Sequence, residues 1–277
     1  MRVGAHESIA GGVSRALARA EEHGARSLQI FTKNARGWKA PPLTEEECHA
    51  FREEVRRTGL PVVAHGSYLV NLGTEEPAQR EKSLDCVVEE LTRCERLGIP
   101  CLILHPGGHP DERRGLALIA RALDEVHART PRFQSRICLE VTAGQGNCLG
   151  WRFEHLAEVL SQTADAGRLG ICLDTCHLFA AGYDLSTEAG YHEVMEECDR
   201  VLGLERVHCI HLNDSKKPLG CRVDRHEEVG KGAIGLTPFR CLMKDARFVN
   251  TIGILETPFP ERYAEVIKRL ESMGRRK

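Results

Sequence analysis

The chain has 277 residues, a formal net charge of −2 and a hydrophobic content of 42%. This composition is typical of a globular protein with a sizeable core. It argues against a protein that coats nucleic acid through an extended basic surface, and the sequence has no apolar run of about 18 residues that could span a membrane.

Short apolar runs alternate with helical periods along the whole chain. Strands are predicted at 2–6, 27–31, 61–65, 101–105, 137–141, 170–174, 207–212 and 251–256. The clearest helix spans about 77–97 and is stopped by Gly98, and another begins at Thr44, where "TEEE" is a capping-box pattern. Eight strand–helix units predict an α/β fold, a single-domain (β/α)8 TIM barrel over residues 1–277. A doubly wound open sheet is the alternative.

The cellular compartment is predicted from the N-terminus and the cysteines. The opening "MRVGAHES" lacks the apolar segment of a signal peptide and leads directly into a predicted strand. The twelve cysteines form no CxxC pair, and several lie in apolar runs, where a free thiol behaves as a small hydrophobic group. We therefore expect a cytoplasmic protein with reduced thiols rather than a disulfide framework.

Chemistry-bearing side chains end seven of the eight predicted strands, and only the second ends in an apolar residue, Phe31. The seven are His6, His65, His105, Glu140, Asp174, His211 and Glu256. Because all strands of a parallel barrel end at one face, these side chains are expected to converge at one mouth. Imidazoles and carboxylates without thiolate suit zinc, manganese or iron. His6 is not assigned to the metal, since a substrate contact or a supporting role fits it equally well.

Three further candidate ligands lie just outside the strands. His177 follows Asp174 by three residues, and Asp224 and His226 form a D-x-H step in "CRVDRHEEVG". Any one of these residues alone is more often a hydrogen-bonded structural residue than a ligand. Together with the six assigned strand-end residues they make nine, too many for one ion, so a site with two or three ions is predicted.

One motif in this region resembles a dinucleotide-binding fingerprint. "GKGAIG" at 230–235 fits the letters of G-x-G-x-x-G, but a strand should precede that fingerprint, and here the polar "DRHEEV" does. The glycines are therefore interpreted as a turn that leads into a helix near Leu236, and no organic cofactor is expected.

A series of motifs resembles the endonuclease IV family, the zinc-dependent apurinic/apyrimidinic endonucleases of DNA repair. In chain order the motifs are "AHGSYLVNLG", "LHPGG", "LEVTAGQG", "CLDTCHLFAAGYD", "HLNDSK", "RVDRHEEVGKGAIG" and "ILETP". They cover essentially the whole chain. The resemblance implies a (β/α)8 barrel with three zinc ions.

The resemblance also distributes the nine candidate ligands among the three ions. One zinc would take His65, His105 and Glu140; a second would share Glu140 and take Asp174, His211 and Glu256; the third would take His177, Asp224 and His226. Glu140, Asp174 and Glu256 are the expected catalytic residues.

DNA contacts are expected from loops of the barrel. Arg36 in "FTKNARGW" and Tyr68 and Leu69 in "GSYL" resemble family residues that enter the duplex at the lesion. Two positions depart from the family pattern: Val141 replaces a polar residue such as Asn, and Gly108 stands where Ser is common. Neither departure removes a candidate ligand.

The implied activity is hydrolysis of the phosphodiester 5′ to an abasic site, which leaves a 3′-hydroxyl and a 5′-deoxyribose phosphate. The expected partner is double-stranded DNA containing abasic sites, and the protein is expected to act as a monomer away from membranes. The alternative enzyme is a metal-dependent sugar isomerase or epimerase on the same barrel, which would not need the trio of His177, Asp224 and His226. A DNA-binding module without catalysis is a third hypothesis, which the presence of all nine candidate ligands disfavours.

Overall fold

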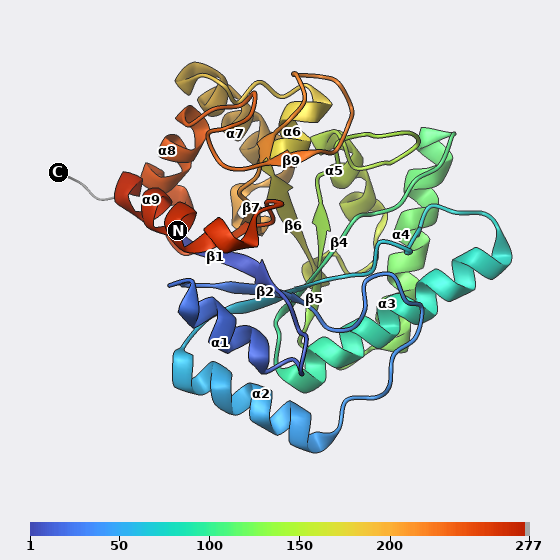
Figure 1. Ribbon diagram of the computed structural model, residues 1–277. Coiled ribbons are helices and arrows are strands. Elements are labelled where there is room, and N and C mark those ends of the chain that lie inside the picture. Colours follow the sequence, from blue (N-terminus) through green and yellow to red (C-terminus); the bar gives the residue numbers. More distant parts are fainter. Residues whose placement is uncertain (275–277) are drawn as a thin grey trace.

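Eight parallel strands form a closed barrel in the computed structural model, which describes residues 1–274 (Figure 1). Neighbouring strands around the barrel follow the order β1-β10-β7-β6-β5-β4-β3-β2. Their bounds are β1 Arg2–Glu7, β2 Leu28–Phe31, β3 Val62–His65, β4 Cys101–Leu104, β5 Arg136–Glu140, β6 Leu169–Asp174, β7 Val207–His211 and β10 Ile252–Leu255. The predicted (β/α)8 barrel is therefore confirmed, and each predicted strand is present within one or two residues.

Helices surround the barrel between successive strands (Figure 1). They are α1 Arg15–Glu22, α2 Glu45–Thr58, α3 Pro77–Leu97, α4 Glu112–Arg129, α5 Phe153–Gln162, α6 Thr175–Ala181, α7 Glu188–Leu202, α8 Thr237–Lys244 and α9 Tyr263–Gly274. The predicted helix over 77–97 and the capping box at Thr44 are both confirmed. None of the helices within residues 1–274 has the length and apolar character needed to cross a bilayer.

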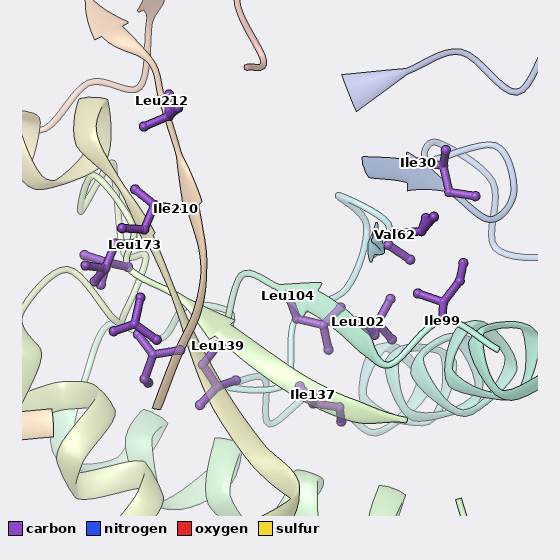
Figure 2. Close-up of a cluster of buried hydrophobic side chains, with 14 of the residues drawn as sticks. Ile30, Val62, Ile99, Leu102, Leu104, Ile137, Leu139, Leu173, Ile210 and Leu212 are labelled. Carbon is purple, nitrogen blue, oxygen red and sulfur yellow. The ribbon is translucent and has the colours of Figure 1, made fainter. Parts of the chain in front are cut away.

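An outer apolar layer joins the strands to the helices (Figure 2). Leu102 and Leu104 of β4, for example, are buried in the same cluster as Leu84 and Leu91 of α3. Since neighbouring side chains on a strand point to opposite faces, every second residue of a strand faces this layer and the residues between face the barrel interior.

The barrel interior holds a second, smaller cluster that determines where the polar side chains lie. It consists of Val63, Cys101, Ile103, Cys138, Cys172, Cys209 and Ile254. Six of these seven residues are followed, two positions later on the same face, by a candidate ligand. Val63 precedes His65 in this way, and Cys138 precedes Glu140. The strands therefore place apolar side chains inside the barrel, and a ring of imidazoles and carboxylates lies next to them at the C-terminal ends of the strands.

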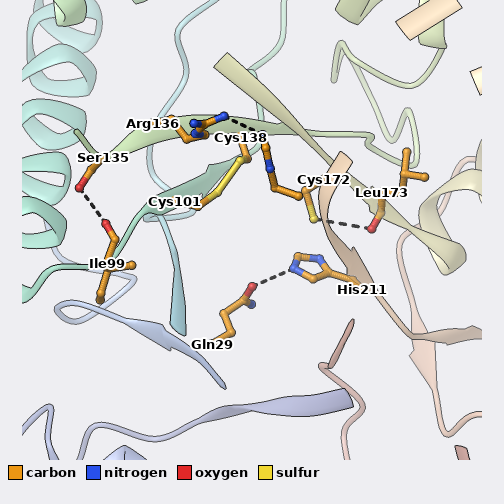
Figure 3. Close-up of a disulfide and its surroundings, with 10 residues drawn as sticks. Gln29, Ile99, Cys101, Ser135, Arg136, Cys138, Cys172, Leu173 and His211 are labelled. Carbon is orange, nitrogen blue, oxygen red and sulfur yellow. Dashed lines mark hydrogen bonds between the residues drawn. A yellow bond between two sulfur atoms is a disulfide. The ribbon is translucent and has the colours of Figure 1, made fainter. Parts of the chain in front are cut away.

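One pair of interior cysteines differs from the expectation of reduced thiols. Cys101 of β4 and Cys138 of β5 are joined by a disulfide, with their Cα atoms 6.3 Å apart (Figure 3). The register pairs Ile103 with Cys138, so Cys101 is the diagonal inward neighbour of Cys138. The prediction is wrong for this pair because strand pairing, which spacing along the chain does not reveal, brings the two side chains together. The other ten cysteines are free, all of them within the described residues.

Helix α3 holds the loop that follows β2, residues 32–41. The Arg93 guanidinium donates to the carbonyl oxygen of Thr32 at 2.7 and 2.9 Å and to that of Pro41 at 2.9 Å. The buried ammonium of Lys33 donates to the carbonyl oxygen of Trp38 at 2.8 Å within the same loop. These bonds to backbone oxygens fix the loop that carries Arg36.

The same helix holds the loop that follows β3, residues 66–69. The Glu90 carboxylate is buried and accepts from the backbone nitrogen of Ser67 at 3.1 and 3.2 Å. Burial raises the pKa of Glu90 to about 7, although the nearby Lys33 ammonium and the Ser67 N–H oppose the increase. One face of α3 thus anchors both loops that were predicted to contact DNA.

Replacing Glu90 with glutamine should remove part of the pH dependence of the free energy of unfolding between pH 5 and 8. The folded-state pKa of Glu90 is raised, so protonation stabilises the folded chain below about pH 4.5 and this contribution is lost as the pH rises through about 7. Between pH 5 and 8 the Glu90→Gln variant should gain up to about 3 kcal/mol relative to the wild type. Urea unfolding at fixed zinc concentration would measure the difference.

Glu81→Gln, an exposed position on the same helix, is the matched control and should show no such pH-dependent gain. A constant stability difference between the Glu90→Gln variant and the wild type from pH 5 to 8 would contradict the raised pKa.

Candidate metal centre

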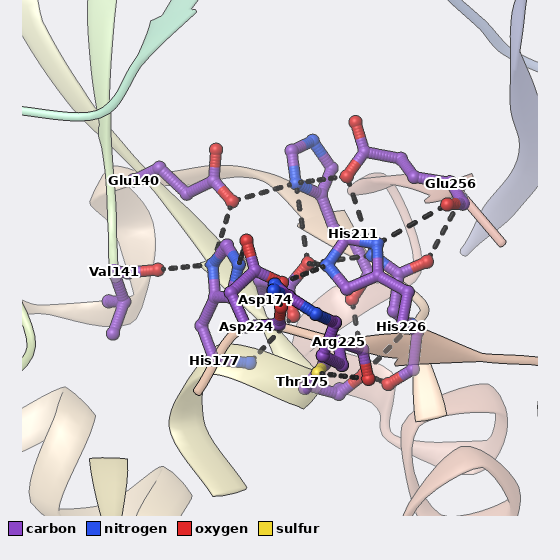
Figure 4. A network of polar contacts seen from close by, with 12 residues as sticks. Glu140, Val141, Asp174, Thr175, His177, His211, Asp224, Arg225, His226 and Glu256 are labelled. Atoms are coloured by element: carbon purple, nitrogen blue, oxygen red, sulfur yellow. Dashed lines mark hydrogen bonds and ion pairs between the residues drawn. The ribbon is translucent and has the colours of Figure 1, made fainter. Parts of the chain in front are cut away.

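Glu140, the last residue of β5, lies among the imidazoles of the barrel mouth, and Figure 4 shows its contacts with His177 and His211. Its buried Oε2 is 3.0 Å from His65 Nε2 and 3.3 Å from His105 Nε2, while Oε1 is 3.1 Å from both His177 Nδ1 and His211 Nδ1. Burial alone would raise the pKa of Glu140, but the imidazoles of His211, His105 and His177 hold it well below its ordinary value. Glu140 is thus a buried carboxylate with a pair of imidazoles at each oxygen.

A second group of side chains gathers around His211 at the end of β7. Its Nδ1 is 3.1 Å from Glu140 Oε1, 3.2 Å from Glu256 Oε2 and 3.7 Å from Asp174 Oδ2. Burial lowers the pKa of His211, but the facing carboxylates of Glu256 and Glu140 outweigh it and raise the pKa well above the ordinary value. Three carboxylates around one imidazole nitrogen leave a concentration of negative charge that a cation would balance.

The third group lies above α6 and the short hairpin of β8 (Asp214–Ser215) and β9 (His226–Glu227). Asp224 approaches His177 Nε2 through Oδ2 and His226 Nε2 through Oδ1, both at 3.1 Å (Figure 4). Although Asp224 is partly buried, which raises its pKa, the two imidazoles hold that pKa far below its usual range. The loop before β9 and the first residue of β9 therefore bring Asp224 and His226 to His177, the trio that the family resemblance implied.

Carbonyl oxygens orient several of these imidazole rings. His177 Nδ1 lies 2.9 Å from the Val141 carbonyl oxygen, His65 Nδ1 lies 2.8 Å from that of Gly66, and His226 Nδ1 lies 3.3 Å from that of Glu256. Because a carbonyl oxygen only accepts, each Nδ1 donates to it, and each Nε2 is the nitrogen that faces the centre of the site. This is the arrangement of imidazoles that ligate metals in proteins.

The donor set fits metal ions. Three overlapping groups have their potential ligand atoms within 4.8 Å of one another: His65, His105 and Glu140; Glu140, Asp174 and His211; and Asp174, His177 and His226. All nine side chains predicted from the sequence lie around the one mouth. The Val141 departure leaves this geometry intact, because the contact to His177 comes from the backbone of Val141.

Two buried amides that the sequence analysis did not identify join the site. Asn213 donates to Asp174 Oδ2 at 2.7 Å and accepts from the Glu256 backbone nitrogen at 2.9 Å. Gln29 of β2 accepts from His211 Nε2 at 2.9 Å. The sequence feature that could have identified Gln29 is its position two residues before Phe31, the end of the strand, because residues two apart on a strand share the inward face.

The three residues predicted to contact DNA lie in the two loops held by α3. Tyr68 is 60% exposed, and its ring centroid lies 5.9 Å from that of His65. Arg36 is exposed, and it lines a cavity of about 560 Å³ together with Tyr68 and His6. Leu69 is half-buried next to Tyr68. Tyr68 and Arg36 are therefore exposed beside the candidate metal centre, and Leu69 is partly covered.

Comparison with known proteins gives the family of this chain. Residues 17–273 match the family model described as a xylose isomerase-like TIM barrel. The probable endonuclease 4 of Chloroflexus aurantiacus is 51% identical over 267 residues, which cover 95% of this chain and 94% of the relative.

Solved structures agree with this relationship. Endonuclease IV from Thermus thermophilus superposes with a TM-score of 0.87 at 38% identity, over 99% of this chain and 98% of that one. A D-tagatose 3-epimerase-like protein, with a TM-score of 0.75 at 17% identity over 99% of this chain and 98% of that one, shares the fold. The chain belongs to the endonuclease IV family.

Proposed function

We propose that this protein is a zinc-dependent endonuclease that acts on double-stranded DNA containing abasic sites. It would hydrolyse the phosphodiester 5′ to the abasic site and leave a 3′-hydroxyl and a 5′-deoxyribose phosphate. The observation that carries the proposal is the convergence of nine imidazole and carboxylate side chains at one barrel mouth, in a chain 51% identical to a probable endonuclease 4.

Three zinc ions are proposed for this mouth. The first would be held by His65, His105 and Glu140; the second by Glu140, Asp174, His211 and Glu256; the third by His177, Asp224 and His226. Imidazole and carboxylate are ordinary zinc ligands, and the oriented Nε2 atoms of His65, His177 and His226 suit them. When bound, zinc supplies electrostatic stabilisation of phosphate oxygens and a water whose pKa is lowered to about 7.

Three carboxylates have separate proposed roles as catalytic residues. Glu140 can bridge two ions, because its two oxygens face different pairs of imidazoles. Asp174 lies between the second and third groups, 3.7 Å from both His211 Nδ1 and His226 Nε2. Glu256 completes the second group. These contacts would orient the ligands around the scissile phosphate.

The exposed side chains beside the site are proposed to recognise the lesion. An abasic nucleotide leaves a gap in the base stack, and extruding it costs less than flipping a paired base. Arg36, Tyr68 and Leu69 would fill that gap, and the fixed loops would keep the ordering cost low. The protein is proposed to act as a monomer and without an organic cofactor.

The alternative of a sugar isomerase or epimerase rests on the fold shared with the epimerase-like protein. Such an enzyme would need one or two divalent ions and would leave His177, Asp224 and His226 without a role. The contacts among these three side chains favour the nuclease.

Glu256→Ala should reduce cleavage of an abasic-site duplex by at least about 100-fold, because it removes a carboxylate that faces His211 at 3.2 Å. Single-turnover cleavage of a labelled duplex would measure the rate. Glu265→Ala on α9, which removes an exposed carboxylate, should cleave at the wild-type rate. Near-normal cleavage by the Glu256→Ala variant would refute the assignment.

Metal analysis of the purified chain should find about three zinc ions, and Asp224→Ala should reduce the content to about two, because it removes the carboxylate shared by His177 and His226. A strong chelator should abolish cleavage of the abasic duplex, and added zinc should restore it. A wild-type content near one manganese ion, with no cleavage, would instead support the epimerase.

Tyr68→Ala should weaken binding to an abasic duplex by about tenfold or more, since stacking of an aromatic ring on a base contributes about 1–3 kcal/mol. Equilibrium binding would be measured with the Glu256→Ala background to prevent cleavage. Val249→Ala removes an equally exposed apolar side chain that precedes β10 at the opposite end of the barrel. Equal affinities of the two variants would contradict a role for Tyr68 at the lesion.

A further inference from the structure

Gln29 supplies a polar side chain from β2, which ends in Phe31, whereas the other seven strands of the barrel end within one residue of an imidazole or a carboxylate. Its side chain is fully buried, and it points from β2 across the barrel towards His211 of β7 (Figure 3). A buried amide requires hydrogen-bond partners, and the partners of Gln29 all belong to the mouth of the barrel.

Three contacts use both ends of the amide. Nε2 donates to Glu256 Oε1 at 2.5 Å and lies 2.9 Å from His6 Nδ1, while Oε1 lies 2.9 Å from His211 Nε2. The ionised carboxylate of Glu256 can only accept a hydrogen bond, so the amide nitrogen must face it. The amide oxygen then faces His211, and the orientation of the amide is determined by its neighbours.

This orientation fixes where the protons lie on two imidazoles. His211 must donate from Nε2 to the amide oxygen, so Nδ1 is the nitrogen that faces Glu140, Asp174 and Glu256 and is left to ligate an ion. His6 Nδ1 has two contacts: the Gln29 amide nitrogen at 2.9 Å and Glu256 Oε1 at 3.4 Å. The Gln29 contact is the shorter, and the amide nitrogen can only donate, so His6 accepts at Nδ1. Its N–H is then at Nε2, an atom with no protein partner within residues 1–274.

We propose that Gln29 is a positioning residue for the metal centre: it orients His211 and Glu256 as ligands of one ion and fixes the tautomer of His6. The inference rests on the proposed zinc site. Partners that orient the ligands of a metal change its affinity by about 10–100-fold when they are removed. A side chain that only filled space would affect the stability of the barrel and leave zinc affinity unchanged.

Two substitutions distinguish a role in positioning the ligands from a role in filling space. Gln29→Met keeps the length of the side chain and removes every hydrogen bond. Gln29→Glu keeps an acceptor for His211 Nε2 but places a carboxylate against Glu256 Oε1, where the amide donates at 2.5 Å. Zinc affinity and the stability of the zinc-free chain should therefore change differently in the two variants.

The experiment measures zinc dissociation constants by competition with a chromophoric chelator, and urea unfolding of the zinc-free chain. For Gln29→Met we expect one zinc ion, the one that His211 and Glu256 would hold, to lose about 10–100-fold in affinity. For Gln29→Glu, which keeps the acceptor for His211 but loses the donor to Glu256, we expect a loss of zinc affinity that is smaller than in Gln29→Met and still greater than about threefold, together with a lower zinc-free stability from two facing carboxylates. Gln162→Met, the same change at an exposed position of α5, is the control and should leave both quantities unchanged.

A Gln29→Met variant that binds zinc as the wild type does would overturn the inference, whatever its stability. If that variant does not fold, Gln29→Glu carries the test, and a zinc affinity equal to that of the wild type would overturn the inference. A wild-type chain that takes up no zinc would refute the proposed function itself. The two failures are therefore distinguishable.

Discussion

The alternation of side chains along parallel strands is the constraint on which the rest of the structure depends. Within the barrel, an apolar or cysteine side chain at one inward position is followed two residues later by a candidate ligand, as in Cys172–Asp174 and Cys209–His211. A shift of one residue in any strand would send its ligand into the outer apolar layer. The packing of the core therefore determines where the candidate metal ligands lie.

The convergence of the strand ends also balances the negative charge of the buried carboxylates at the barrel mouth. Glu140 and Asp174 are fully buried, and such carboxylates persist only with donors or cations around them. The protein supplies imidazoles and the Asn213 amide, and the orienting contacts of His65, His177 and His226 turn their Nε2 atoms towards the same space. Imidazole nitrogens and carboxylate oxygens directed at common points form a set of ligands that metal ions can bind.

The sequence was sufficient for the barrel and for the six candidate ligands at strand ends, because hydrophobic period and strand ends are local patterns. Two motifs outside the strands also identified His177, Asp224 and His226. It did not reveal the role of Gln29, which is separated by 182 residues from His211 and by 227 from Glu256, so only the closed barrel shows these contacts. The disulfide between Cys101 and Cys138 was missed for the same reason, since it depends on the register between β4 and β5.

The loop that follows β3 has a further consequence. Tyr68 is only three residues beyond His65, and its ring centroid lies 5.9 Å from that of His65 and 5.4 Å from that of Phe31. A proposed lesion contact and a proposed zinc ligand therefore share one short segment of backbone and one cluster of neighbouring aromatic rings. A displacement of Tyr68 against a damaged duplex would therefore reach the imidazole of His65, so the proposed lesion contact and the proposed ligand would be coupled through this segment.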